Sequence, residues 1–333
     1  MNATVNRQVL LVEKPVGKLG PEHFKLSEGA IPEPKDGEAL LRTRYISLDA
    51  ANRAWMHGAT YRAAVEANTV MAGGGIAEVV SSKSPSLAPG DIVFGDTGWQ
   101  DYAAVPAKHL SKQPKIEPMT HLLSVYGIAG LTAYFGLLDV GQPRPGDTVV
   151  VSTAAGAVGS AVGQIAKITG CRTVGIAGGP AKVAQCRELF GYDAAIDYKS
   201  DDLASALAAS CPRGVDVYFD NTGGEISDTV LRHLAVGARV VICGTASVSS
   251  WDPWPNGPRA ERHLLVKRAR MQGFVIFDYA PRFEEALARL AQWIRDGRLR
   301  YSEDVLEGIE QAPGAIAGLY RGENTGKRLI KIR

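Results

Sequence analysis

The pattern of hydrophobic positions changes well before the middle of the chain. Apolar runs rich in Val, Leu and Ile cover residues 8–12 and 39–46 and are separated by turns that contain Pro and Gly. Another apolar run, 73–80, is followed by the turn Pro89–Asp91 and by a further run over 92–95. Short apolar runs bounded by such turns predict strands, and the last two predict a hairpin or a barrel. We therefore expect the N-terminal part to be rich in β-strands.

From about residue 122 onwards, compact apolar runs alternate with helix-length segments. The expected strands are 148–152, 173–177, 194–198, 215–220 and 239–244, and the expected helices are 158–169, 182–191, 203–210 and 226–234. Gly170, Gly191 and Gly237 fall where a helix would end. This alternation predicts a doubly wound parallel sheet. A long amphipathic helix is expected over 281–296, and the tail, 328–332, returns to the alternation of a strand.

The length of the chain allows two such regions to be separate domains. It has 333 residues, and a domain typically holds about 100 to 200 residues. We expect an α/β protein in which a β-rich domain, residues 1–126 and 300–333, is interrupted by a doubly wound parallel-sheet domain over residues 127–299.

Composition and charge exclude several classes of protein. Apolar residues make up 45% and charged residues 22% of the chain, which excludes a largely disordered protein. Lys and Arg number 37 against 35 Asp and Glu, without a dense basic stripe, so we expect no nucleic-acid partner. Residues 148–166 carry no charge, but polar residues and glycines interrupt them. We expect a strand, a loop and a helix there and no membrane span.

The cysteines and histidines do not form a metal-ligand pattern. Cys171, Cys186, Cys211 and Cys243 lie 15, 25 and 32 residues apart, and the histidines of the N-terminal part form no spaced pair. We therefore expect no bound metal, and free thiols in a reducing compartment, although an even number of cysteines also allows disulfides. The N-terminus lacks the apolar core of a secretory signal, which favours a cytoplasmic protein.

A glycine-rich sequence follows the expected strand 148–152. Residues 154–159 read Ala-Ala-Gly-Ala-Val-Gly, which matches the dinucleotide-binding pattern G-x-G-x-x-G with Ala154 at the first glycine position. Gly156 would let the backbone approach a pyrophosphate, and Gly159 would let the next helix lie close to the strand. The free N–H groups of that helix would face the phosphates. The residues assigned to dinucleotide binding are Ala155, Gly156, Ala157, Val158 and Gly159.

The end of the next expected strand indicates which dinucleotide binds. An NAD site would place Asp or Glu there, but residues 177–182 read Ala-Gly-Gly-Pro-Ala-Lys. Because no carboxylate repels a 2′-phosphate and Lys182 follows closely, the sequence favours NADP(H), with Gly178 in the same turn. Tyr198, at the end of the third expected strand, could complete the pocket. Lys182 could instead be a solvated residue of the first helical turn.

Several further motifs resemble those of one protein superfamily. They are Tyr-Ile-Ser-Leu-Asp at 45–49 followed by Arg53, Trp-Gln-Asp-Tyr at 99–102, Gly-Leu-Thr-Ala-Tyr-Phe-Gly-Leu at 130–137, Tyr-Phe-Asp-Asn-Thr-Gly-Gly at 218–224, Met-Gln-Gly-Phe at 271–274 and Glu-Asn-Thr-Gly-Lys at 323–327. With the glycine loop, they resemble the zinc-independent branch of the medium-chain dehydrogenases/reductases. This branch includes the leukotriene hydroxydehydrogenase/prostaglandin reductases, plant alkenal double-bond reductases and bacterial curcumin reductases. The resemblance covers nearly the whole chain.

The resemblance implies a GroES-like β-domain joined to a Rossmann domain, with NADP(H) and substrate held between them. It also implies a homodimer formed by edge strands of the Rossmann sheets, near 239–244 and 272–277. Lys182 and Tyr198 would contact the 2′-phosphate side of the cofactor.

The resemblance also assigns residues to the nicotinamide end of the cofactor. Asn221, Cys243 and Gly244 would line the nicotinamide and its ribose, and Asn324, in one turn with Gly326, would reach the nicotinamide. Each has an alternative role: Asn221 and Asn324 could stabilise turns, and Cys243 could fill the core.

One segment departs from the related sequences. Where they often have Asp-Pro-Tyr-Met-Arg, this chain has Asp-Ala-Ala-Asn-Arg at 49–53 and lacks the aromatic residue. The expected pocket therefore includes Ala51, Asn52 and Arg53. The aromatic residues that could replace the missing wall are Tyr61, Trp251 and Trp254, although Trp residues near prolines are as often loop anchors.

The implied reaction is the NADPH-dependent reduction of the carbon–carbon double bond of an α,β-unsaturated ketone or aldehyde, without a metal. Hydride would go to the β-carbon, and the resulting enolate oxygen would need a hydrogen-bond donor. That donor could be Tyr45, Tyr61 or a ribose hydroxyl of the cofactor. Two alternatives are a zinc-free NADPH quinone oxidoreductase and a non-catalytic NADPH-binding protein.

Overall fold

The computed structural model describes residues 5–248 and 253–333, and it separates into two compact units. The first unit contains the described residues up to Leu123 together with Glu303–Arg333. The second unit contains the described residues of Ser124–Ser302. Each unit has a hydrophobic core of its own, which is typical of a domain. Trp251, which we expected in the substrate pocket, lies outside the described residues.

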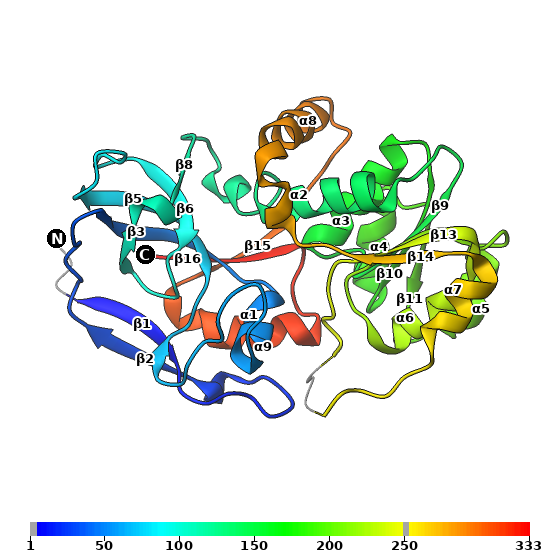
Figure 1. The fold of residues 1–333 in the computed structure, drawn as a ribbon, viewed down its shortest axis with the longest axis horizontal. Helices are drawn as coiled ribbons and strands as arrows, with labels where there is room; N and C mark the ends of the chain where they lie inside the picture. The colour runs from blue at the N-terminus through cyan, green and yellow to red at the C-terminus, as the bar shows by residue number, and fades with distance from the viewer. Residues whose placement is uncertain (1–4, 249–252) are drawn as a thin grey trace. The chain divides into compact units, whose positions relative to one another are not determined.

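The first unit is built on two β-sheets (Figure 1). The strands of the larger sheet are β3 (Glu38–Ser47), β5 (Gly74–Ser82), β6 (Ile92–Asp96), β7 (Tyr102–Pro106), β8 (Ser111–Gln113), β15 (Glu303–Glu307) and β16 (Lys327–Lys331). Their order is β15-β16-β3-β5-β6-β8, and β7 also pairs with β3. The expected hairpin is confirmed, because β5 and β6 pair in an antiparallel register. The expected C-terminal strand is also present as β16, which pairs with β3.

The smaller sheet of the first unit contains β1 (Asn6–Leu11), β2 (Phe24–Gly29) and β4 (Thr69–Val70), in the order β2-β1-β4. The helices α1 (Ala51–His57) and α9 (Ala312–Arg321) contribute to the same core as β1. Trp99 is fully buried in that core, where its ring stacks on Phe24 with centroids 5.4 Å apart. This packing gives the Trp-Gln-Asp-Tyr motif a structural role.

The second unit is a parallel sheet of six strands. They are β9 (Thr148–Ser152), β10 (Arg172–Ala177), β11 (Ala194–Asp197), β12 (Val215–Asp220), β13 (Leu234–Ile242) and β14 (Arg270–Gly273). The order is β11-β10-β9-β12-β13-β14, and every neighbouring pair is parallel. This arrangement confirms the expected doubly wound sheet of the Rossmann type.

Helices cover both faces of this sheet (Figure 1). They are α2 (Ile128–Phe135), α3 (Ala157–Ile168), α4 (Pro180–Glu188), α5 (Leu203–Ser210), α6 (Gly224–Leu231), α7 (Ala260–Lys267) and α8 (Phe283–Arg295). Val149 and Val151 of β9 face the core that contains α2, α3 and α8, whereas Val150 faces the core that contains α5 and α6. The strand is apolar along its whole length because both of its faces are buried.

Several of the expected boundaries in this unit were wrong, among them those of the helix expected over 182–191, which spans Pro180–Glu188. The helix expected over 226–234 ends at Leu231, and β13 begins at Leu234 rather than at 239. Gly237 therefore lies inside β13 and does not end a helix. It has φ +76° where the register between β12 and β13 shifts, and this left-handed conformation suits glycine in a bulge. The long helix begins at Phe283, after a 3-10 helix, Ile276–Arg282, that accommodates Pro281.

Among the described residues, none of the helices has the length and apolar character needed to cross a membrane. The uncharged stretch 148–166 consists of β9, the glycine-rich loop and part of α3, as expected.

Candidate cofactor and active site

The candidate cofactor site lies at the carboxyl edge of the second sheet, where β9 and β12 are neighbours. The strand order reverses between these two strands, and ligands of such sheets bind in the crevice that this reversal creates. Ser152 ends β9 and Asp220 ends β12, and both are buried. The two strand ends therefore bring polar side chains to the position where the fold leaves room for a ligand.

The loop after β9 leads into the N-terminus of α3 at this carboxyl edge of the sheet. Thr153 has φ +53°, an unusual conformation for a residue with a side chain, and it turns the chain sharply. A Cβ at Gly159 would lie 2.3 Å from the Thr153 carbonyl oxygen, so only glycine lets α3 start so close to the strand. The first helical bond joins Ser160 to Gly156, and no side chain caps this helix. Within the described residues, the N–H groups of residues 157–159 have no protein acceptor and could bind phosphate oxygens.

Ala154 occupies the first glycine position of the pattern because of a compensating glycine on the neighbouring strand. Ala154 is fully buried and donates its N–H to the Ile176 carbonyl at 3.0 Å. A Cβ at Gly175 of β10 would lie 2.7 Å from the Ala154 Cβ. Gly175 therefore provides the space that a glycine at 154 would have provided.

Asp220 organises the turn that follows β12. Its carboxylate accepts hydrogen bonds from the Tyr218 hydroxyl at 3.0 Å and the Ser227 hydroxyl at 2.7 Å. It also accepts from the backbone N–H groups of Thr222 and Gly223, both at 2.9 Å. Asp220 was not among the site residues expected from the sequence. Its position as the last residue of an apolar strand run is the signal that could have identified it.

Asn221 lies next to Asp220 and is tied to β9. Its backbone N–H donates to the Ser152 hydroxyl at 2.8 Å, and its side-chain Nδ2 donates to the Ser152 carbonyl at 2.7 Å. The turn-stabilising role that we considered for Asn221 is therefore present. The orientation is also compatible with the implied ribose role, because the side-chain oxygen is not used in these bonds.

The residues that follow β13 lie beside the end of β12 and the turn after it. The N–H groups of Cys243 and Gly244 donate to the Asp220 carbonyl at 2.8 and 3.1 Å. A Cβ at Gly244 would lie 3.1 Å from the Asn221 carbonyl oxygen, so glycine permits this approach. Burial raises the pKa of the Cys243 thiol to about 12. The Cys243 thiol is therefore uncharged at neutral pH.

The candidate 2′-phosphate pocket lies at the ends of β10 and β11. Tyr198 donates its N–H to the Ala177 carbonyl at 3.1 Å, which holds its ring beside Gly178. A Cβ at Gly178 would lie 2.9 Å from Tyr198 Cε1, so a larger residue would displace the ring. Lys182 lies in the first turn of α4 and is half-buried. The structure thus places the three predicted residues Gly178, Lys182 and Tyr198 around one turn.

The predicted nicotinamide residue Asn324 belongs to the first unit and is buried. Its Nδ2 donates to the Gly326 carbonyl at 2.7 Å, so the local turn that we considered as an alternative is present. The next residue, Lys327, is also buried, donates to the Leu48 carbonyl at 3.1 Å and forms an ion pair with Asp49. This ion pair connects the motif at 323–327 with the motif at 45–49.

The two candidate tyrosines differ in their surroundings. Tyr45 is on β3, is half-buried and packs against a small apolar cluster around Ile76. Tyr61 is 53% exposed and lies edge-on to Trp55 with ring centroids 6.2 Å apart. Desolvation is the main cause that raises the pKa of Tyr61 above its usual value. A tyrosine hydroxyl keeps its proton at neutral pH, so Tyr61 can act as a hydrogen-bond donor.

The expected pocket residues of α1 make internal bonds. Asn52 accepts from the Asp49 N–H at 2.8 Å and donates to the Ala72 carbonyl at 3.1 Å. Arg53 is buried, bonds the Gly17 carbonyl and lies over the Tyr320 ring at 5.1 Å.

The other two expected pocket residues differ in exposure. Ala51 is half-buried and packs against the main core of the first unit, whereas Trp254 is 76% exposed. A substrate role for these two residues, and for Asn52 and Arg53, stays a prediction.

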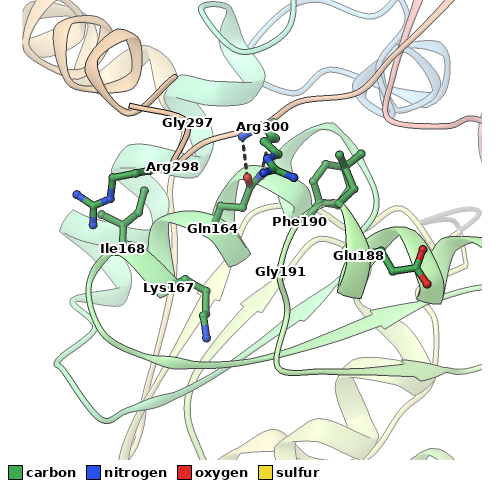
Figure 2. Close-up of a pocket in the computed structure, with 10 residues that line it drawn as sticks. Gln164, Lys167, Ile168, Glu188, Phe190, Gly191, Gly297, Arg298 and Arg300 are labelled. Atoms are coloured by element: carbon green, nitrogen blue, oxygen red, sulfur yellow. Dashed lines mark hydrogen bonds between the residues drawn. The ribbon is translucent and has the colours of Figure 1, made fainter. Parts of the chain in front are cut away.

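A separate pocket of about 370 Å³ opens in the second unit (Figure 2). It is lined by Gln164, Lys167, Ile168, Glu188, Leu189, Phe190, Gly191, Gly297, Arg298 and Arg300. The Gln164 side chain accepts from the Arg300 N–H at 2.7 Å and donates to its carbonyl at 2.8 Å. The pocket lies at the C-terminal ends of α3 and α4, where the helix dipoles disfavour phosphate. It is therefore a poor match for the cofactor.

Comparison with known proteins agrees with this architecture. Residues 7–113 match a family described as the N-terminal domain of oxidoreductase, and residues 157–292 match one described as zinc-binding dehydrogenase. The chain is 40% identical over 336 residues to the NADPH-dependent curcumin reductase of Escherichia coli, covering 98% of this chain and 97% of the relative. It is 39% identical over 315 residues to prostaglandin reductase 1 of Bos taurus, covering 92% and 93%. The crystal structure of CurA from Vibrio vulnificus in complex with NADPH matches with a TM-score of 0.92 at 41% identity, covering 98% and 99%.

The described residues contain no group of three or more His, Cys, Asp or Glu side chains that could hold a metal ion. The similarity to the reductases extends over both units and nearly the full length of each relative. The chain belongs to the medium-chain dehydrogenase/reductase superfamily, in the zinc-independent branch that contains the curcumin and prostaglandin reductases.

Proposed function

We propose that this protein is an NADP(H)-dependent oxidoreductase that reduces the carbon–carbon double bond of α,β-unsaturated ketones or aldehydes. The observation that carries the proposal is the carboxyl edge of the second sheet. At this edge, the N–H groups of residues 157–159 have no protein acceptor among the described residues. The neighbouring turn, 177–182, contains no Asp or Glu and ends in Lys182. The similarity to an NADPH-dependent curcumin reductase over 98% of the chain supports the same reaction class.

Different residues of the second unit bind different parts of the cofactor. Residues 155–159 bind the pyrophosphate through backbone N–H groups and the start of α3. Gly178, Lys182 and Tyr198 take the 2′-phosphate, and Asn221, Cys243 and Gly244 line the ribose and nicotinamide. The Asp220 network supports this last group, because it holds both the 221–224 turn and the residues after β13. Asn324 and Gly326 of the first unit remain candidates for the nicotinamide end.

When bound, the cofactor would supply a hydride to the β-carbon of the substrate, and a proton taken up at the α-carbon of the resulting enolate would complete the reduction. The chain itself has to orient the substrate and donate a hydrogen bond to the enolate oxygen. Tyr61 suits this role because a tyrosine hydroxyl keeps its proton at neutral pH and because part of its side chain is exposed. Tyr45 is the second candidate. Replacing each in turn with Phe should identify the donor by a loss of kcat.

The decisive experiment follows the absorbance of NADPH, and separately of NADH, with purified protein and a 2-alkenal, a benzylidene ketone and a quinone. Oxidation of NADPH with the alkenal or the ketone supports the proposal. Turnover with the quinone alone would instead support an NADPH quinone oxidoreductase. Tight NADPH binding without turnover of any compound would indicate a non-catalytic binding protein, and a preference for NADH would contradict the 2′-phosphate pocket.

We also propose that the protein forms a homodimer through the edge of the second sheet. The edge strand β14 has four exposed residues, and α7, which contacts β13, exposes Leu265 and Val266 by 79% and 57%. Exposed apolar residues beside an open strand edge favour pairing with a second chain. Light scattering of the protein and of the Val266→Glu variant tests this. A monomeric parent protein would contradict it.

A cytoplasmic location is the remaining part of the proposal. Its support is that Cys171, Cys186, Cys211 and Cys243 are free thiols, as in proteins of reducing compartments. Fractionation of the source cells, with the activity measured in each fraction, tests the location. Activity confined to a membrane or exported fraction would contradict it.

A further inference from the structure

We propose that Lys199 is a second cationic determinant of NADP(H) specificity, which contacts the 2′-phosphate from the side opposite Lys182. The inference rests on the proposed function only in assuming that the 2′-phosphate lies at the turn 177–182. Lys199 is the residue after Tyr198 and was not among the site residues expected from the sequence.

The position of Lys199 follows from the pairing of β10 with β11. Ala177 is the register partner of Asp197, so the residues that follow the two strands leave the sheet side by side. A Cβ at Gly178 would lie 3.0 Å from Lys199 Cε and 3.1 Å from the Tyr198 hydroxyl. The methylene chain of Lys199 and the ring of Tyr198 therefore converge on Gly178. A lysine that only extended into solvent would not approach this glycine.

Asp197 holds the turns that carry the two lysines. Its Oδ1 accepts from the Gly179 N–H at 2.8 Å and from the Lys199 N–H at 3.1 Å. One carboxylate oxygen thus joins the turn before Lys182 to the turn that carries Lys199. Hydrogen bonds from the backbone, the one from Gly179 first, lower the pKa of Asp197, so this carboxylate is ionised at neutral pH.

The acidic residues near Lys199 in the sequence have other hydrogen-bond partners. Asp201 accepts from the Asp197 N–H at 2.9 Å, and Asp202 caps α5 by accepting from the Ser205 N–H at 3.1 Å. The Lys199 charge contributes to lowering the pKa of Asp197, but within the described part of the chain Lys199 forms no ion pair with these carboxylates. Lys199 is exposed, so its charge is accessible to a ligand. A phosphate with two negative charges at Gly178 is the chemistry that fits two lysines and a tyrosine hydroxyl.

The test uses 2′,5′-ADP and 5′-AMP, which differ only by the 2′-phosphate, in titration calorimetry with the full-length protein. We expect Lys199→Gln to weaken 2′,5′-ADP binding about three- to tenfold, because the contact is charge-assisted but exposed. It should leave 5′-AMP binding unchanged, and Lys199→Arg should restore most of the affinity. Arg213→Gln is the matched control, since it also removes one exposed positive charge. Arg213 lies just before β12, at the amino-terminal ends of the strands and so away from the turn 177–182.

The outcomes separate this inference from the cofactor assignment. If the parent protein binds 2′,5′-ADP and 5′-AMP equally well, the 2′-phosphate site and the role of Lys199 are both wrong. If the parent prefers 2′,5′-ADP and Lys182→Gln weakens it but Lys199→Gln does not, the site stands and the role of Lys199 is refuted. Equal losses in the Arg213→Gln and Lys199→Gln variants would show a general charge effect and would also refute it.

Discussion

Asn221 and Ser152 are joined by two hydrogen bonds across the carboxyl ends of β12 and β9. The Ser152 hydroxyl accepts from the Asn221 N–H at 2.8 Å, and the Ser152 carbonyl accepts from the Asn221 side chain at 2.7 Å. The same hydroxyl donates to Asp220 at 3.3 Å. One serine therefore couples the loop that is proposed to bind the pyrophosphate with the turn that is proposed to bind the ribose.

Ser152→Ala should destabilise the protein by about 1–3 kcal/mol, because it leaves the Asn221 N–H without a partner at a buried strand end. It should also raise the KM for NADPH, since the turn after β12 loses a contact to β9. Denaturant unfolding and steady-state kinetics measure the two effects. The control is Ser86→Ala on an exposed loop, which should change stability by less than about 0.5 kcal/mol. Equal stabilities of the two variants would contradict the role of Ser152.

The ion pair between Asp49 and Lys327 should respond asymmetrically to mutation. The Lys327 side chain is 4% exposed, whereas that of Asp49 is 44% exposed. Asp49→Ala leaves an ammonium group buried without its charge partner, which we expect to cost about 3–5 kcal/mol. Lys327→Met leaves a carboxylate that water can reach, so its cost should be clearly smaller. Thermal or urea unfolding of both variants checks the order, and a larger cost for Lys327→Met would refute the argument.

The contact between Ala154 and Gly175 predicts a double-mutant effect. Gly175→Ala should destabilise the protein by about 1–3 kcal/mol through overpacking, because the new Cβ would lie 2.7 Å from that of Ala154. Ala154→Gly restores the first glycine of the loop and removes this clash. The double variant should therefore recover much of the lost stability. Additive losses in a denaturant-based cycle would show that the two positions do not compete for the same space.

The cysteines should be unreactive in the folded protein even though the proposed substrates are electrophiles. Burial raises the pKa of Cys186 from 9.0 to about 12 and that of Cys211 to about 11. The thiolate is the nucleophile, and its population at neutral pH is therefore very small. A chromogenic disulfide reagent at about pH 8 should titrate these thiols only after the protein is denatured. Rapid reaction of the native protein would contradict this expectation.

Because the pKa values of Cys186 and Cys211 are raised in the folded protein, we expect the free energy of unfolding to depend on pH. The folded protein retains protons that the unfolded chain releases above its ordinary thiol pKa of 9.0. This contribution to stability is fully present below pH 9.0 and is lost as pH rises through the folded values of about 11 and 12. The free energy of unfolding should therefore fall in alkaline solution. Cys186→Ala and Cys211→Ala variants should show a shallower fall, and an unchanged slope would refute the assignment.

Strand and helix positions were most predictable where the pattern was strongest. Residues 148–152, 215–220 and 203–210 form β9, β12 and α5 with the expected bounds, because each is an uninterrupted apolar or periodic run flanked by turn residues. The start of β13 was not predictable in this way. Leu234 to Gly237 resemble the end of a helix in sequence, and only pairing with β12 across a bulge makes them part of a strand.

The sequence by itself determined the nature of the two turns that are proposed to bind phosphate. Gly156 and Gly159 are needed wherever a helix starts close to a strand end, and the lack of a carboxylate over 177–182 is a local property of the chain. Only the tertiary structure decided which distant residues support these turns. Gly175 makes room for Ala154, Asp220 holds the turn beside Asn221, and Lys199 reaches Gly178. The physical reason is that these contacts depend on the register of neighbouring strands, which joins residues far apart in the sequence and leaves no local pattern.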